Sequence, residues 1–143
     1  MTKANVLIVD DEVEFGNIVA ERLRGRGFGV DTAENGAAGL EMVRNKAYDA
    51  IIVDLAMPGM DGIETMKAMF EVDANLQIII LTGHGSIQKG VEAVKLGASD
   101  FLEKPADIEQ LTTKVTEAQQ KRVALFEQDL EEKMSNIMRK KGW

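Results

Sequence analysis

Three aspartates lie where the sequence predicts strand ends. Asp10 and Asp11 directly follow the apolar run of residues 5–9, and Asp54 directly follows a second run, residues 50–53. Two carboxylates about 4 Å apart repel by roughly 4 kcal/mol at an effective dielectric of about 20, so a cluster of three requires a cation or shared protons. Oxygen ligands without His or Cys favour a hard ion, most naturally Mg²⁺. An isolated Asp-Asp pair is more often a helix cap, and Asp54 at a matching strand end is what favours the metal site.

A hydroxyl and an ammonium group are expected at the same place. Thr82 follows the apolar run of residues 77–81, and Lys104 follows the run of residues 100–103. Lys is a compact charge for a phosphoryl oxygen, and Thr can donate a hydrogen bond to another one. Either residue alone is usually a turn residue or a solvated side chain. Together with the aspartates they predict a phosphoryl-transfer site with a carboxylate nucleophile.

Apolar runs alternate with helical periodicities along the whole chain, and this alternation would position the polar residues. We expect strands at 5–9, 29–33, 50–53, 77–81 and 100–103, and helices at 13–23, 35–46, 62–70, 87–96 and from about 107 onward. Such a pattern predicts an α/β fold with a parallel sheet and helices on both faces. The expected architecture is a flavodoxin-like (βα)5 three-layer sandwich of strand order 2-1-3-4-5. Its ligand crevice lies at the carboxyl ends of the first and third strands.

The composition fits one domain of this kind in a reducing cytoplasm. The 143 residues include 45% apolar and 29% charged side chains and no cysteine, which excludes disulfides and thiolate metal sites. The N-terminus has too few consecutive apolar residues for a signal peptide or a membrane span. The net charge of −7 argues against direct nucleic-acid binding. A protein partner is therefore expected.

Four segments suggest a family. VLIVDDE, IIVDLAMPGMDG, IILTGHG and ASDFLEKP resemble, in order and spacing, the signature segments of response-regulator receiver domains. The resemblance covers about residues 4–120 and is closest to receivers of the nitrogen-regulatory type. It implies that Asp54 accepts a phosphoryl group from a sensor histidine kinase or a phosphotransfer protein. It also implies a switched protein–protein surface on the helix at 87–96, the strand at 100–103 and the last helix.

The resemblance assigns a metal-binding role to four residues. Asp11 would bind Mg²⁺ directly, and Asp10 would assist through water. Asp54 and the backbone carbonyl of Ala56 would complete the protein ligands. Ala56 and His84, each the second residue after a signature Asp or Thr, would also tune the lifetime of the phosphoryl group. The alternative for His84, the single histidine, is a solvated loop residue.

Further roles concern the phosphoryl group and the switch. Thr82 and Lys104 would hold the phosphoryl oxygens, and the Lys104–Pro105 peptide bond would be cis. Thr82 and Phe101 would form the switch pair, although Phe101 could be an ordinary core aromatic. Gly90 lies inside the helix at 87–96 and costs about 1 kcal/mol relative to Ala. We therefore expect that helix to shift easily on phosphorylation.

The C-terminal part of the chain continues as a helix. We expect a receiver domain at residues 1–120 and a helical extension at 121–143, which is too short for a DNA-binding or catalytic domain. A second apolar stripe begins at Val123, about 80° around the helix from the first. The extension could fold onto its own domain or fray, or it could mediate a homodimer. The face formed by the helix at 87–96, the strand at 100–103 and the last helix is a second possible homodimer surface.

Two other function classes share parts of this pattern. An aspartyl-phosphate hydrolase also uses a strand-end Asp and Mg²⁺, but such enzymes usually carry a second Asp where this chain has Ala56. A receiver-like scaffold that takes no phosphate would normally lack one of the acids, the Thr or the Lys, and all are present. The expected protein is not an enzyme toward other molecules. It would catalyse only its own phosphotransfer and slow autodephosphorylation.

Overall fold

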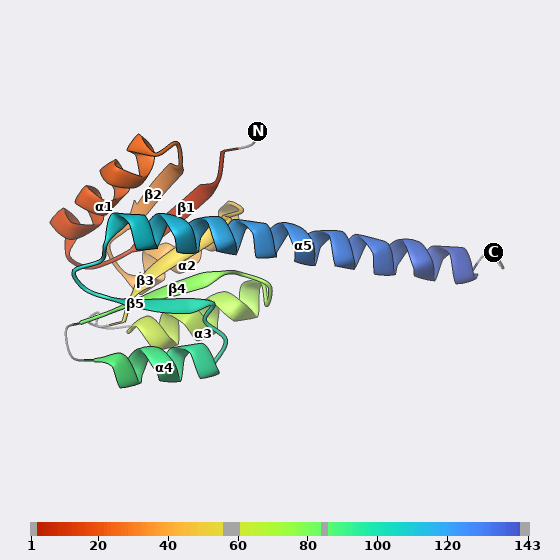
Figure 1. The fold of residues 1–143 in the computed structure, drawn as a ribbon. Helices are drawn as coiled ribbons and strands as arrows, with labels where there is room; N and C mark the ends of the chain where they lie inside the picture. The colour runs from red at the N-terminus through yellow and green to blue at the C-terminus, as the bar shows by residue number, and fades with distance from the viewer. Residues whose placement is uncertain (1–2, 56–60, 84–85, 141–143) are drawn as a thin grey trace.

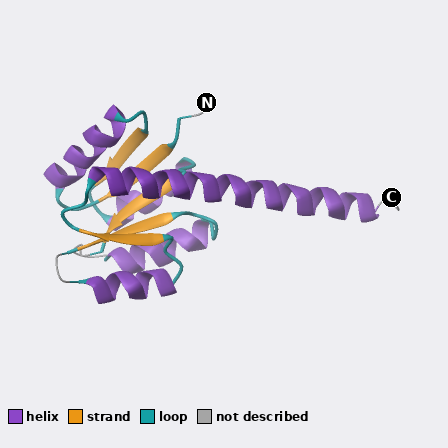
Figure 2. Ribbon diagram, viewed as in Figure 1, coloured by secondary structure: helices purple, strands orange, loops and turns teal. Residues whose placement is uncertain are grey.

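The chain folds into a parallel sheet between two layers of helices (Figures 1 and 2). The computed structural model describes residues 3–55, 61–83 and 86–140. The strands are β1 (Asn5–Val9), β2 (Gly29–Ala33), β3 (Ala50–Asp54), β4 (Ile78–Thr82) and β5 (Asp100–Glu103). The helices are α1 (Val13–Gly25), α2 (Gly36–Asn45), α3 (Gly62–Val72), α4 (Ile87–Lys95) and α5 (Ile108–Lys140). The strands pair in the order β2-β1-β3-β4-β5, all parallel, which confirms the predicted fold.

Alternating side chains of the central strands build two cores. Leu7 of β1 packs with residues of α2 and α3 on one face, together with Ala93 of α4. The next residue, Ile8, packs with α1 and the first half of α5 on the other face. Every residue of β3 and β4 is buried, as is typical of strands covered on both faces by helices. The long apolar runs in the sequence therefore mark the middle of the sheet.

Two strands extend one residue further than the apolar runs predicted. Asp54 lies inside β3, beside Leu81 of β4, and Thr82 lies inside β4, beside Glu103 of β5. Both polar residues keep the ladder conformation because a neighbouring strand pairs with them. The consequence is that their side chains are held by the sheet itself and not by a loop.

The last helix is the longest element. α5 runs without interruption from Ile108 to Lys140, and no helix in the described ranges is both long and apolar enough to cross a membrane. Its first half is anchored to the sheet by three buried residues, Leu111, Val115 and Ala118. Its second half projects beyond the body of the domain (Figure 1). The helix continues through residue 120, and the division into a domain and an extension stays a prediction.

Candidate functional site

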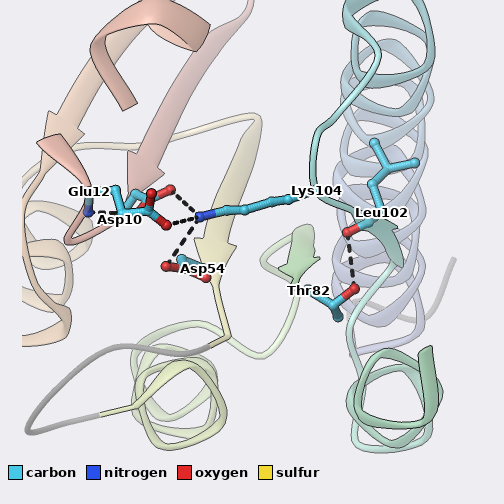
Figure 3. A network of polar contacts seen from close by, with 6 residues as sticks. All are labelled: Asp10, Glu12, Asp54, Thr82, Leu102 and Lys104. Carbon is cyan, nitrogen blue, oxygen red and sulfur yellow. Dashed lines mark hydrogen bonds and ion pairs between the residues drawn. The ribbon is translucent and has the colours of Figure 1, made fainter. Parts of the chain in front are cut away.

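One ammonium group lies among three carboxylates at the carboxyl ends of β1, β3 and β5 (Figure 3). The Nζ atom of Lys104 is 3.1 Å from Asp10 Oδ2, 3.4 Å from Asp54 Oδ2 and 3.0 Å from Glu12 Oε1. The parallel sheet produces this meeting, because the carboxyl ends of all its strands share one edge. The structure thus brings together Asp10, Asp54 and Lys104, which the sequence predicted to lie in one crevice.

Asp10 is held rigidly and has one oxygen aimed into the site. The residue is 3% exposed, and its Oδ1 accepts a hydrogen bond of 2.9 Å from the backbone N–H of Glu12. Its Oδ2 is buried and lacks a hydrogen-bond partner within the described residues, although Lys104 approaches to ion-pair distance. A buried carboxylate oxygen without a hydrogen bond is costly. This oxygen is therefore suited to a cation.

The surroundings of Lys104 keep its side chain protonated. Burial alone would lower the pKa of the ammonium, but the hydrogen bond to Glu12 and the charges of Asp10 and Asp54 outweigh it. The pKa consequently lies above its ordinary value. The ammonium also lies 4.4 Å from the centre of the Phe15 ring, a distance at which the face of an aromatic ring attracts a cation. Lys104 is thus a permanent positive charge at this position.

Thr82 and Phe101 lie on the adjacent strands β4 and β5. Thr82 is fully buried, and its hydroxyl donates a hydrogen bond of 3.4 Å to the carbonyl oxygen of Leu102 (Figure 3). Phe101 is half-buried and packs against the core. A Cβ built on Gly90 of α4 would lie only 2.3 Å from Cδ2 of the Phe101 ring. Glycine is needed at position 90 because the ring of Phe101 occupies the space of a side chain.

A second glycine shapes the region after Asp54. A Cβ on Gly62 would lie 2.6 Å from the backbone oxygen of Asp54 and 2.5 Å from Cα of Leu55. The Gly62 N–H donates a hydrogen bond of 3.0 Å to the Leu55 carbonyl. This close approach joins the end of β3 to the start of α3. It brings Leu55 and Gly62 together beside the site.

Some predicted residues are placed differently or are not placed. Ala56 and His84 lie outside the described residues. Asp11 is exposed, whereas the described carboxylates close enough together to hold one ion are those of Asp10, Glu12 and Asp54. The roles predicted for Asp11, Ala56 and His84 stay predictions. The Lys104–Pro105 bond is cis in the structure, the isomer that the resemblance implies.

Two residues at the site were missed by the sequence reasoning. Glu12 binds Lys104, and Phe15 lies against the same ammonium. Glu12 directly follows the Asp pair, so its charge was visible in the sequence. Its direction was not, because only the start of α1 determines where the side chain points. Phe15 was hidden among the apolar residues expected in the same helix.

The arrangement can hold a divalent cation and a phosphoryl group. Its donors are carboxylate oxygens, which suit Mg²⁺, and Oδ2 of Asp10, which accepts no hydrogen bond from the described residues, fits a metal ligand. Asp54 is 4% exposed and lies at the carboxyl edge of the sheet, beside the ammonium of Lys104. The residues present therefore fit both the ion and the chemistry predicted from the sequence.

Comparison with known proteins identifies the family of this site. The family model described as the response regulator receiver domain matches residues 6–116 of the sequence. The chain belongs to the response regulator receiver family. A solved receiver domain from Clostridium thermocellum is similar to this receiver with a TM-score of 0.82 and 28% identity, covering 85% of this chain and 98% of that one. The receiver domain of NtrX from Brucella abortus is similar with a TM-score of 0.77 and 29% identity, covering 80% and 98%.

Longer relatives share only this domain. The transcriptional regulatory protein FixJ of Bradyrhizobium diazoefficiens is 37% identical over 117 residues, covering 82% of this receiver and 57% of the relative. The transcriptional regulatory protein ZraR of Klebsiella oxytoca is 39% identical over 116 residues, covering 81% of this receiver but 26% of the relative. The receiver thus corresponds to about a quarter to about half of these regulators.

Proposed function

We propose that this receiver accepts a phosphoryl group on Asp54 from a sensor histidine kinase or a phosphotransfer protein. The observation that carries the proposal is the buried Asp54 carboxylate 3.4 Å from the ammonium of Lys104, beside the carboxylate of Asp10. A carboxylate nucleophile needs nearby positive charge to stabilise the charge that develops on the transferred group. Family membership supports a kinase or a phosphotransfer protein as the donor. The receiver would be located in the cytoplasm.

In the proposed reaction, one oxygen of Asp54 attacks the phosphorus of a phosphohistidine. The new P–O bond forms as the P–N bond breaks, and the imidazole nitrogen leaves with the electron pair. Lys104 and Thr82 bind phosphoryl oxygens, and Lys104 keeps its proton because its pKa is raised. Mg²⁺ supplies the further positive charge that such a transfer requires. Asp10 and Asp54 would hold the ion, together with Asp11 and the Ala56 carbonyl as the resemblance implies.

The receiver would act on no molecule other than its donor. Its own catalysis would consist of this transfer and of slow autodephosphorylation, whose rate Ala56 and His84 would tune. Such a protein is a switch and not a metabolic enzyme. It would carry its signal to another protein, because its net charge of −7 opposes direct contact with nucleic acid.

The proposed output surface is formed by α4, β5 and the first half of α5. Thr82 would turn from the Leu102 carbonyl toward the phosphorylated Asp54 and so release a hydrogen bond at β5. Phe101, the residue before Leu102, would follow, and its ring contacts Gly90 of α4. α4 also exposes Ile87 and Val91, apolar residues suited to a protein partner. These contacts provide a continuous route from the site to α4.

Incubation with acetyl phosphate and Mg²⁺, followed by intact-mass measurement, tests the proposal. We expect a phosphate-sized mass gain in the wild type and in Asp73→Asn, which changes an acid remote from the site, but not in Asp54→Asn. Omission of Mg²⁺ should abolish the gain. A wild type that gains no mass would contradict the proposal and would favour a scaffold role.

A further inference from the structure

Of the three described carboxylates around the Lys104 ammonium, that of Glu12 is the exposed one (Figure 3). Its side chain is 64% exposed, compared with 1% for Asp10 and 5% for Asp54. Its Oε1 atom is nevertheless the nearest to the ammonium, at 3.0 Å, and accepts a hydrogen bond from it. An exposed carboxylate can return to water at little cost. The closest partner of Lys104 is therefore also the easiest to displace.

Glu12 occupies the N-cap position of α1 without capping that helix. Among the described residues its side chain makes no cap hydrogen bond, and glutamate is not one of the residues preferred at an N-cap. Its backbone N–H is fixed by the hydrogen bond to Oδ1 of Asp10, while its side chain turns to Lys104. Capping therefore does not explain the direction of this side chain, whereas contact with the ammonium does.

The ammonium of Lys104 would have to exchange one partner for a phosphoryl oxygen. An ammonium group has three N–H donors, and three carboxylates lie within 3.4 Å of this nitrogen. Asp10 is buried and held by its own hydrogen bond, and Asp54 would carry the phosphoryl group itself. Glu12 is left as the carboxylate that gives way.

The Glu12 carboxylate also lies close to the space that the phosphoryl oxygens would enter. One oxygen of Glu12 is within 4.8 Å of one oxygen of Asp54. A phosphoryl group joined to Asp54 places its oxygens two bonds beyond the carboxylate oxygen and carries a charge of about −1.5 to −2. If it is directed at Lys104, it approaches the like charge of Glu12, which repels it. In charge and in its contact with the ammonium, Glu12 resembles the incoming phosphoryl oxygen.

We propose that Glu12 competes with the transferred phosphoryl group for the Lys104 ammonium and thereby slows the phosphorylation of Asp54. The inference rests on the proposed phosphotransfer to Asp54. Glu12 forms no bond to the phosphorus and acts through Lys104, so it is a positioning residue. The same contact stabilises the unphosphorylated receiver, because it pairs a charge that is only partly exposed. Glu12 should therefore raise stability and lower the reaction rate, whereas a purely structural ion pair would only raise stability.

Phosphorylation by acetyl phosphate at saturating Mg²⁺, followed over time by intact mass, tests the competition. Glu12→Gln keeps the size of the side chain and removes its charge. Glu14→Gln makes the same charge change at another exposed position of the same helix. We expect Glu12→Gln to raise the second-order rate constant by about two- to fivefold, the range for a partly exposed ion pair, and Glu14→Gln to match the wild type. A Glu12→Gln rate constant no higher than that of Glu14→Gln would overturn the proposal.

Two further measurements separate competition from a structural role. Urea unfolding without a phosphodonor should show Glu12→Gln to be less stable than the wild type, opposite in direction to its faster reaction. Beryllium trifluoride, a phosphoryl mimic that binds aspartate, should half-saturate Glu12→Gln at a concentration about two- to fivefold lower, measured by fluorine NMR. Lower stability with unchanged binding of the mimic would mean a structural pair and would refute the competition. A wild type that gains no phosphate would refute the proposed function as well, whereas equal rates in wild type and Glu12→Gln would refute the competition alone.

Discussion

The ring of Phe101 lies directly on the backbone of Gly90, with Cδ2 only 2.3 Å from the place where a Cβ would stand. This contact joins β5 to α4. It explains why position 90 is a glycine despite the low helix propensity of that residue. The expectation that α4 shifts easily on phosphorylation stays a hypothesis. The close approach of the Phe101 ring to Gly90, in contrast, is observed in the structure. Any side chain at position 90 would have to displace the ring.

Replacement of Gly90 by Ala should therefore have opposite effects in two backgrounds. In the wild type, the clash with Phe101 should outweigh the helix propensity gained, and we expect a net loss of about 1 kcal/mol in the free energy of unfolding. In a Phe101→Ala background the clash disappears, and the same change should stabilise by up to about 1 kcal/mol. Urea unfolding of the four proteins measures both. Equal effects in the two backgrounds would show that the ring and Gly90 are not coupled.

Removal of the Lys104 charge should expose the repulsion among the carboxylates. Without Mg²⁺, Lys104→Met should destabilise the receiver by about 2 kcal/mol, less than the loss of a fully buried pair because Lys104 is only partly buried and its partner Glu12 is exposed. Mg²⁺ should bind this variant more tightly, because no ammonium competes for Asp10 and Asp54. Titration calorimetry and unfolding with and without Mg²⁺ check both parts. Lys95→Met, a change at an exposed lysine of α4, serves as the control and should leave Mg²⁺ affinity unchanged.

Two single changes separate the roles of Asp11 and Glu12. Family resemblance assigns the direct metal contact to Asp11. In the structure, however, it is the Glu12 carboxylate that lies with those of Asp10 and Asp54, and it binds Lys104. We expect Asp11→Asn to lower Mg²⁺ affinity by about tenfold or more, as loss of a ligand should. Glu12→Gln should change the affinity far less and lower the pKa of Lys104, which NMR of its ammonium can follow. The reverse order of affinities would assign the metal contact to Glu12.

The hydrogen bond between Tyr48 and Asp31 of the edge strand β2 predicts that the stability of the protein depends on pH. Tyr48 donates to Asp31 at 2.7 Å, and this bond, together with Lys46, holds the pKa of Asp31 below its ordinary value. A lowered pKa in the folded state stabilises the protein above about pH 4, and that stability is lost as the pH falls through the folded pKa.

Tyr48→Phe should therefore cost roughly 1 kcal/mol at neutral pH, a low value for a bond to a charged group because Asp31 is partly exposed. The difference from the wild type should shrink as the pH drops below about 4. Chemical unfolding at a series of pH values provides the measurement. A difference that stays constant with pH would mean that the ionisation of Asp31 is not involved.

The sequence was sufficient for the topology because its signals were strong and local. Runs such as residues 50–53 and 78–81 are apolar throughout, and each is followed by polar residues that end up at one edge of the sheet. Asp10, Asp54 and Lys104 could be grouped in advance because strand order alone fixes where parallel strands end. The strand boundaries were less certain, since Asp54 and Thr82 extend their strands by pairing with neighbours that no local pattern reveals.

The direction in which individual side chains point could not be predicted from the sequence. Glu12 and Asp11 are adjacent acids, yet one binds Lys104 and the other is exposed. Gly90 was interpreted through its propensity because its neighbour Phe101 is distant in the chain and reaches it only across the fold. Both cases depend on tertiary contacts, which periodicity does not encode.

The continuity of α5 has a mechanical consequence. Its first half is clamped to the sheet by Leu111, Val115 and Ala118, and its second half extends for about 30 Å beyond that clamp. A tilt of about 5° at the clamp would carry the far end roughly 3 Å sideways, given the rise of an α-helix. A displacement of the clamped half that is too small to alter its packing against the sheet therefore becomes, at Lys140, a shift comparable to the spacing of side chains.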